Sequence, residues 1–505
     1  MEQPMTPPLM PPRGQWQRRA LNAIGRVRGI SFPKWLTQYG MLVYVVALAT
    51  VSLLYSAYSL PWYYVLSGVV AVFVFFVIGS RLVEQTSVFK VHREKNFERR
   101  IFFIALMLRV AWMFLIYTIF MNSYGDAFGF ENGDALFYDE LGREFSKAIR
   151  EGSFVSTWRS TTSYLDISDM GYAVWVGAIY WLTEDSIIAV RLLKCLWSAL
   201  TVLLIYRLAK RNFGEQTARI AAIFVALWPN FWYYCGCHLK EIEMTFLSVL
   251  FVEQADQMLR SRQFTAWKII PILLIAAMLL TFRTPLALVA LLSLIFSVVM
   301  SSSRVVSWGK RIVVGVLAAL LIGVTLGNQI QEQAKDLVEQ VREDQQKTNM
   351  EWRATRDNAN VFAKYAGKSV FAPLIFTIPF PSFVRPFEGQ DHLQIVNGGN
   401  FVKNIVSFFT IFAMVMLLLS GKWREHLLPL SFMLGYLVVL TMSSFAQSER
   451  FHQPVMPFEL MFMAYGISVA LTKKKYKRWF MYWCVLMFIA SIAWNWFKLA
   501  GRGLA

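Results

Sequence analysis

Two aspartates follow an apolar run of about twenty residues, in a pattern that suits proton transfer. Asp126 and Asp134 both occur in the tripeptide Gly-Asp-Ala, within the aromatic-rich stretch SYGDAFGFENGDALFY, and Tyr138 follows Asp134 by one helical turn. A carboxylate at the mouth of a helix bundle suits a general base that acts on a lipid-borne substrate. Asp134 also suits a helix cap, and a cap would hold the same carboxylate in place.

Residues 134–151 fit an amphipathic helix, in which apolar residues recur every four positions. We expect this helix to lie on the membrane surface, and Gly152 is placed to end it. The predicted apolar stripe consists of Phe137, Leu141, Phe145 and Ile149. The acidic residues expected on its solvated face are Asp139, Glu140 and Glu144.

Cations stand at the ends of several apolar runs, where a lipid phosphate would lie. Lys240, Arg283 and Arg450 fall in short turns, and Arg191 begins a run. Arginine binds phosphate through paired donors, and cations at a membrane edge often mark function. Because these cations share one predicted face with the carboxylates, we expect them to form a phosphate site. The alternative is that each side chain only reaches the lipid headgroups.

Polar residues beside these cations are candidates for supporting roles or for metal ligands. They are His238, Glu241, Glu243, Glu449 and His452. Their types do not separate the two roles, so a divalent metal ion is left open and no cofactor is assigned. Cys235-Gly-Cys237 followed by His238 supplies only part of a usual metal site.

The composition is that of a membrane protein. The chain has 505 residues, 56% hydrophobic and only 16% charged, with a mean hydropathy of +0.44. We predict an all-α polytopic membrane protein with about thirteen transmembrane helices and amphipathic juxtamembrane helices in the first outer loop. The predicted spans are 36–58, 61–80, 101–121, 186–206, 217–235, 241–258, 268–283, 285–302, 312–330, 401–419, 425–446, 455–472 and 479–497.

The distribution of Lys and Arg predicts the orientation. More than half of them fall in the predicted cytoplasmic pieces, so the N-terminus is expected inside and the C-terminus outside. The net charge of +18 then reflects topology and contact with anionic membrane lipids, not nucleic acid. Loops 122–185 and 331–400 are expected outside. This alternation requires that residues 170–185 lie in the outer interface and do not cross.

Several stretches together resemble the GT-C superfamily, which comprises integral-membrane glycosyltransferases that use polyprenyl-phosphate-linked sugars. Within it, the chain resembles the protein mannosyltransferases and the aminoarabinose transferases. Asp134 and Tyr138 match the pattern of the first outer loop. The stretches IIAVRLLKCLW to ALWPNFWYY, HLKEIE and ERFHQPVMPFELMFMAYG resemble later spans and loops. The resemblance covers residues 101–300 and 440–472.

The chain departs from the family's pattern in two places, and the resemblance implies an order of domains. Two extra spans, within 36–80, precede the usual start, and Ala135 stands where the family has the second acid of an Asp-Glu pair. This leaves open whether Asp134 or Asp126 is the catalytic carboxylate. The expected parts are a basic cytoplasmic N-terminus (1–35), two extra spans with a cytoplasmic loop (36–100), a GT-C-like core (101–330), an outer loop (331–400) and C-terminal spans (401–505).

The implied function is transfer of a sugar from a polyprenyl-phosphate donor to a glycan, lipid or protein acceptor, outside a bacterial inner membrane. A polysaccharide (O-antigen) polymerase is one alternative, but that class centres on Arg-rich outer loops. A lipid-linked sugar flippase or a transporter is the other, and it predicts charges deep within spans. Such charges are nearly absent from the predicted spans, and Arg109 is the main exception. The sugar, the acceptor, the stereochemical course, the oligomeric state and metal dependence stay open.

Overall fold

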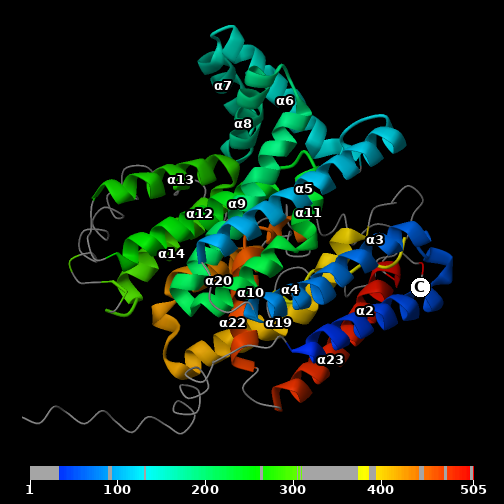
Figure 1. Ribbon diagram of the computed structural model, residues 1–505. Coiled ribbons are helices and arrows are strands. Elements are labelled where there is room, and N and C mark those ends of the chain that lie inside the picture. Colours follow the sequence, from blue (N-terminus) through cyan, green and yellow to red (C-terminus); the bar gives the residue numbers. More distant parts are fainter. Residues whose placement is uncertain are drawn as a thin grey trace, which may run out of the picture.

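The protein is helical throughout the described part of the computed structural model (Figure 1). The structure describes residues 33–88, 94–129, 132–261, 266–303, 374–385, 394–442, 448–470 and 475–500, with a few single positions besides. Of these described residues 86% are helical, and none lies in a strand. The first helices are α2 (Lys34–Leu54), α3 (Trp62–Phe73), α4 (Gly79–Val88), α5 (Glu94–Tyr124), α6 (Asn132–Arg150), α7 (Phe154–Thr162) and α8 (Ile167–Thr183). They are followed by α9 (Ile187–Phe213), α10 (Glu215–Ala226), α11 (Pro229–Gly236), α12 (Glu241–Arg260), α13 (Ile269–Phe282) and α14 (Thr284–Met300). The last are α19 (Ile395–Ser420), α20 (Leu427–Met442), α21 (Glu449–His452), α22 (Met456–Ala470) and α23 (Lys475–Ala500).

Six described helices are long and apolar enough to cross a membrane, which makes this a membrane protein. They are Lys34–Leu54, Trp62–Thr86, Asn96–Tyr124, Ile187–Phe213, Ile395–Ser420 and Tyr476–Ala500. Shorter apolar helices are Ile269–Phe282, Thr284–Met300, Leu427–Met442 and Met456–Ala470. The predicted total of about thirteen spans stays a prediction, and the span at 312–330 lies outside the described residues.

Two predicted boundaries are wrong for identifiable reasons. The span expected at 217–235 is two helices, α10 and α11, because Pro229 occupies the first turn of α11 and cannot continue the preceding helix. Helix α19 begins at Ile395, inside the segment predicted as loop. Its first turns hold Asn397, Gly398, Gly399 and Asn400, which a hydropathy reading assigns to a loop but which are buried here.

The break between α10 and α11 is held by a buried arginine from the neighbouring helix. Arg109 donates to Ser198 Oγ on α9 at 2.6 Å and to the carbonyls of Val225 and Ala226 at 3.2 and 3.1 Å. The last carbonyls of a helix lack partners within it, so this guanidinium satisfies them inside the bundle. The mid-span charge at Arg109 therefore has a structural role.

Helices α6, α7 and α8 form a group at one end of the molecule, at the top of Figure 1. Helix α8 lies against α6, and glycines make the close approach possible. A Cβ atom on Gly142 would lie 2.5 Å from Val176, and one on Gly177 would lie 2.6 Å from the Cβ atom of Phe145. This contact fixes the rotation of α6, and therefore decides which of its acids face solvent.

The predicted apolar stripe of α6 is divided between the protein interior and the surface. Leu141 and Phe145 are buried as expected, together with Ala135 and Tyr138, but Phe137 is exposed. The buried face follows the contact with α8, which lies to one side of the stripe that periodicity alone suggests.

Candidate active site

A chain of ion pairs joins three segments that are far apart in the sequence. Arg450, on the short helix α21, donates from Nη1 to Asp134 on α6 at 2.8 Å and from Nε to Glu241 on α12 at 2.8 Å. The Asp134 side chain is 60% exposed and the Glu241 side chain only 2%. Arg450 therefore links a solvent-accessible carboxylate to a buried one.

Asp134 lies inside the first turn of α6, which begins at Asn132, so its predicted position as the N-cap is wrong. A carboxylate in the first turn still gains from the positive end of the helix dipole. Its side chain reaches out of the helix to Arg450 instead of back to the helix N–H groups. This leaves Asp134 accessible to a substrate.

A second ion pair lies beside the first. Lys240 precedes Glu241 and pairs with Asp169, in the first turn of α8, while Tyr138 donates to the same Asp169 oxygen at 2.9 Å. Burial raises the pKa of Asp169, but the charge and hydrogen bond of Lys240 outweigh it and hold that pKa below its ordinary value. Burial and Asp169 raise the pKa of Tyr138, so this phenol remains a hydrogen-bond donor.

Arg283 stands close to both pairs, in the turn between α13 and α14. Its guanidinium lies 4.0 Å from the ring centre of Phe451, the neighbour of Arg450. Its charge also contributes to the lowered pKa of Asp169. The structure thus brings together three of the four cations proposed for phosphate binding, Lys240, Arg283 and Arg450, with Asp134, Tyr138 and Glu241.

Arg191, the fourth predicted cation, is placed differently. It is fully buried on α9, donates to the carbonyl of Ala127 and lies 5.6 Å from the ring centre of Tyr117. These contacts tie the loop after α5 to the bundle. Its Nε and Nη1 atoms are buried and make no hydrogen bond within the described residues, so a part in phosphate binding stays a prediction.

Asp126, the rival carboxylate, is occupied within its own loop. Its Oδ1 atom accepts from the backbone N–H groups of Phe128 and Gly129 at 2.7 and 3.0 Å. Such a turn is a common local use of aspartate. The contacts of Asp126 and Asp134 therefore differ, and those of Asp134 reach the cation cluster.

Beneath the two ion pairs lies a buried polar layer that sequence reasoning largely missed. Lys194, on α9, donates to Tyr172 at 3.1 Å and to the carbonyl of Cys237 at 3.0 Å, and lies 3.6 Å from Glu243. His238 is buried among aromatic rings, 5.9 Å from that of Tyr172. Burial and nearby cations, Lys194 first, keep the pKa of His238 well below its ordinary value. Its imidazole is therefore neutral.

His452 belongs to a separate buried group. Its Nδ1 atom lies 2.7 Å from the Nζ atom of Lys403 on α19, and Lys403 pairs with Glu459 on α22 at 3.6 Å. Lys403 also donates to the carbonyl of Ile378, so this group holds the segment 374–385 against the bundle. Lys194, Lys403 and Glu459 are thus buried charged residues within apolar helices, besides Arg109.

The signal for these residues is present in the sequence but weak. Lys194, Lys403 and Glu459 all lie within the first three turns of their helices. A charge there is easily read as a residue at the membrane edge. Asp169 precedes an apolar segment and reads as its flank, whereas its partner Lys240 is distant in the sequence.

The described residues contain no group of three or more His, Cys, Asp or Glu side chains placed to hold a metal ion. Glu449 begins α21, beside Arg450.

Asp139, expected on the solvated face of α6, is instead buried. Tyr180 of α8 donates to its Oδ1 atom, and Arg143 donates to its Oδ2 atom at 2.9 Å. The reason is the rotation of α6 that the contact with α8 imposes. Asp139 therefore helps to fasten α8 to α6.

We expect Asp139→Asn to destabilise the protein, because the change removes the charge of a buried hydrogen-bonded pair. The expected loss is about 1–3 kcal/mol, seen as a lower Tm of the purified protein in detergent. Glu140→Gln is the matched control, since Glu140 is the exposed neighbour on the same helix. Equal Tm values for the two variants would show that the contact with Tyr180 and Arg143 contributes nothing.

The fold and the cluster define an integral-membrane helical protein with a charged site at one end of its bundle. Residues 171–326 match the model of the family described as dolichyl-phosphate-mannose-protein mannosyltransferase, which belongs to the GT-C superfamily. The matched segment includes Lys240, Glu241 and Arg283. No curated protein and no solved structure matches the chain significantly.

Proposed function

We propose that this protein is a membrane glycosyltransferase that transfers a sugar from a polyprenyl-phosphate-linked donor to an acceptor at the extracytoplasmic membrane surface. The family match supports glycosyl transfer and a lipid-linked donor. The observation that carries the proposal is the convergence of Asp134, Arg450, Glu241, Lys240 and Asp169, contributed by four helices and a turn, beside apolar helices.

The residues of this cluster can supply both the base and the cations that the transfer reaction requires. The acceptor hydroxyl attacks the anomeric carbon, the bond from that carbon to the phosphate oxygen breaks, and the polyprenyl phosphate leaves with the electron pair. Asp134 takes the proton of the acceptor hydroxyl, as a general base does. Arg450, Lys240 and Arg283 stabilise the charge that develops on the leaving phosphate.

The ion pairs of this structure suggest how the site prepares for a donor. Arg450 here divides its donors between Asp134 and Glu241. An incoming phosphate competes with the exposed Asp134 for Arg450 more easily than with the buried Glu241. Glu241 then keeps Arg450 in position, and Asp134 is released to meet the acceptor.

Other residues near the cluster complete the proposed arrangement. Tyr138 and Asp169 orient Lys240, while Arg191, His238 and His452 lie in the buried layers behind the site.

We propose that the protein lies in a bacterial inner membrane with the N-terminus inside and the C-terminus outside, as the Lys and Arg distribution favours. The two N-terminal spans contact the C-terminal part of the chain, since α2 lies against α23 and α3 against α19. We propose that they are an added module.

Transfer activity without a membrane gradient tests the function. The detergent-solubilised protein is expected to release polyprenyl phosphate from a synthetic polyprenyl-phosphate sugar when an acceptor is present. A flippase or a transporter moves its substrate between compartments and therefore needs sealed vesicles. Movement of the intact donor across sealed vesicles, with no transfer in detergent, would contradict the proposal. A polymerase would instead lengthen an existing glycan chain in the same assay.

A further inference from the structure

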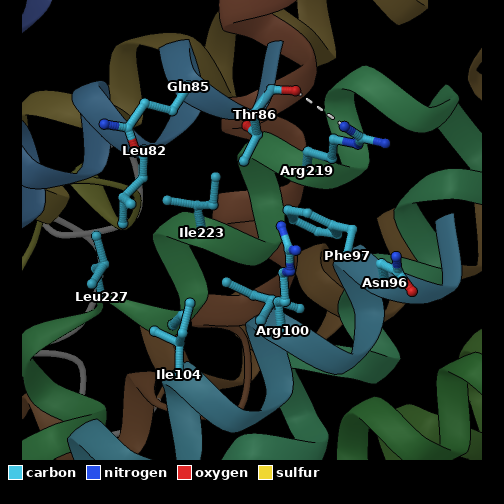
Figure 2. Close-up of a pocket in the computed structure, with 12 residues that line it drawn as sticks. Leu82, Gln85, Thr86, Asn96, Phe97, Arg100, Ile104, Arg219, Ile223 and Leu227 are labelled. Carbon is cyan, nitrogen blue, oxygen red and sulfur yellow. Dashed lines mark hydrogen bonds between the residues drawn. The ribbon is translucent and has the colours of Figure 1, made fainter. Parts of the chain in front are cut away.

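A pocket lies between α4, α5 and α10, and Figure 2 shows its lining. Its volume is about 250 Å³. One part of the lining is polar, with Arg100 and Asn96 on α5 and Gln85 on α4. The other part is apolar, with Ile104 and Leu227. The pocket is thus amphipathic along the axis of α5, because Arg100 and Ile104 are one helical turn apart.

The two arginines of the pocket differ in their contacts. Arg219, on α10, pairs with Glu215 at 2.6 Å, donates to the carbonyl of Thr86 at 3.1 Å and lies 5.1 Å from the ring centre of Phe97. Arg219 therefore forms a fixed wall. Arg100 is exposed, and no described residue pairs with it. Its charge is available to a ligand.

The apolar side of the pocket opens on a surface that faces lipid. Ile104 lines the pocket and is itself 45% exposed, and its neighbours Phe103 and Met107 are 48% and 66% exposed. All three lie on α5, in a segment apolar enough to cross a membrane. A ligand here would have contact with hydrocarbon at one end and with a cation at the other.

The pocket is remote from the charged site. Arg100 lies near the start of α5, whereas the loop that leads to Asp134 follows its end at Tyr124. The intervening turns of helix span about 36 Å, close to the thickness of a membrane. The pocket therefore lies at the opposite membrane surface from the candidate active site.

We propose that this pocket binds an anionic membrane lipid, with its phosphate at Arg100 and part of an acyl chain along Ile104 and Leu227. The charge of Arg100 complements a phosphate, and Gln85 and Asn96 add amide donors to the pocket lining. The apolar half and its opening on the lipid-facing side of α5 select a lipid over a soluble anion. This inference does not depend on the proposed transfer reaction.

Lipid binding to the purified full-length protein tests the proposal. After delipidation in detergent, native mass spectrometry is expected to show tighter retention of phosphatidylglycerol than of phosphatidylcholine. Arg100→Gln should weaken phosphatidylglycerol binding about fivefold and leave phosphatidylcholine binding unchanged. Arg100→Lys keeps the charge and should retain most of the binding, which also guards against a folding defect in the first variant.

Arg99→Gln is the matched control, because Arg99 is the adjacent residue on α5 and lies over Phe103 at 5.9 Å, outside the pocket lining. It should leave lipid binding unchanged. Equal effects of Arg99→Gln and Arg100→Gln would overturn the proposal, since they would indicate a general effect of surface charge. Displacement of the lipid by inorganic phosphate alone would also overturn it, because a soluble anion would then be the ligand.

Discussion

Asp134→Asn is expected to lower sugar transfer by about 10² to 10⁴, the usual cost of removing a general base. Asparagine has nearly the same shape, and loss of the carboxylate's interaction with the helix dipole costs only about 0.3–1 kcal/mol at an exposed position, so the fold should persist. It cannot accept the acceptor's proton, and it removes the ion pair with Arg450. The measurement is the rate of transfer by the purified protein, with Tm as the check on folding.

Two carboxylates serve as controls for Asp134. Glu140→Gln removes an exposed charge from the same helix and should leave transfer nearly normal. Asp126→Asn should also have a small effect, because an asparagine oxygen accepts the same backbone hydrogen bonds from Phe128 and Gly129. If Asp126→Asn abolishes transfer and Asp134→Asn does not, then Asp126 is the base and our assignment is wrong.

Arg450→Lys should lower the rate of transfer by about 10². The variant keeps the positive charge but loses the planar guanidinium, which can donate to two separate acceptors at once. Lysine cannot reproduce the two separate contacts with Asp134 and Glu241, each at 2.8 Å. We choose lysine over alanine because an uncompensated buried Glu241 would cost about 3–5 kcal/mol and confuse a catalytic effect with unfolding. The turnover rate and the donor KM should both change.

Arg207→Lys provides the comparison for Arg450→Lys. Arg207 pairs with Glu98 at 3.0 Å through a half-exposed side chain, far along α9 from its first turn. Exposed pairs of this kind contribute little, so transfer should be unaffected. Normal transfer by Arg450→Lys, at an unchanged Tm, would show that Arg450 is not needed at the reacting centre.

The sequence was informative about which residues gather at the site, and less so about their contacts. Asp134, Lys240, Glu241 and Arg450 all follow or precede apolar runs, and that common position predicted that they would meet. The partner of Lys240 could not be predicted, because the pairing with Asp169 depends on how α8 lies against α6. Periodicity describes one helix at a time, whereas an ion pair between helices depends on their packing.

Asp139 illustrates the same limit within a single helix. The spacing in α6 correctly indicates a helix with one apolar face, and Leu141 and Phe145 are buried on it. The exact rotation is set by Gly142 and Gly177, which allow α8 to approach closely and bring Tyr180 to Asp139. A buried carboxylate with partners on another helix looks identical in sequence to a solvated one.

The most direct test of the account is a structure of the full-length protein with a polyprenyl phosphate bound. The phosphate is expected to lie within hydrogen-bond distance of Arg450, with Lys240 and Arg283 beside it, and Asp134 is expected to have turned away from Arg450 toward the acceptor side. A phosphate bound instead at Arg191, or at Lys403 and His452, with the contact between Asp134 and Arg450 intact, would contradict it.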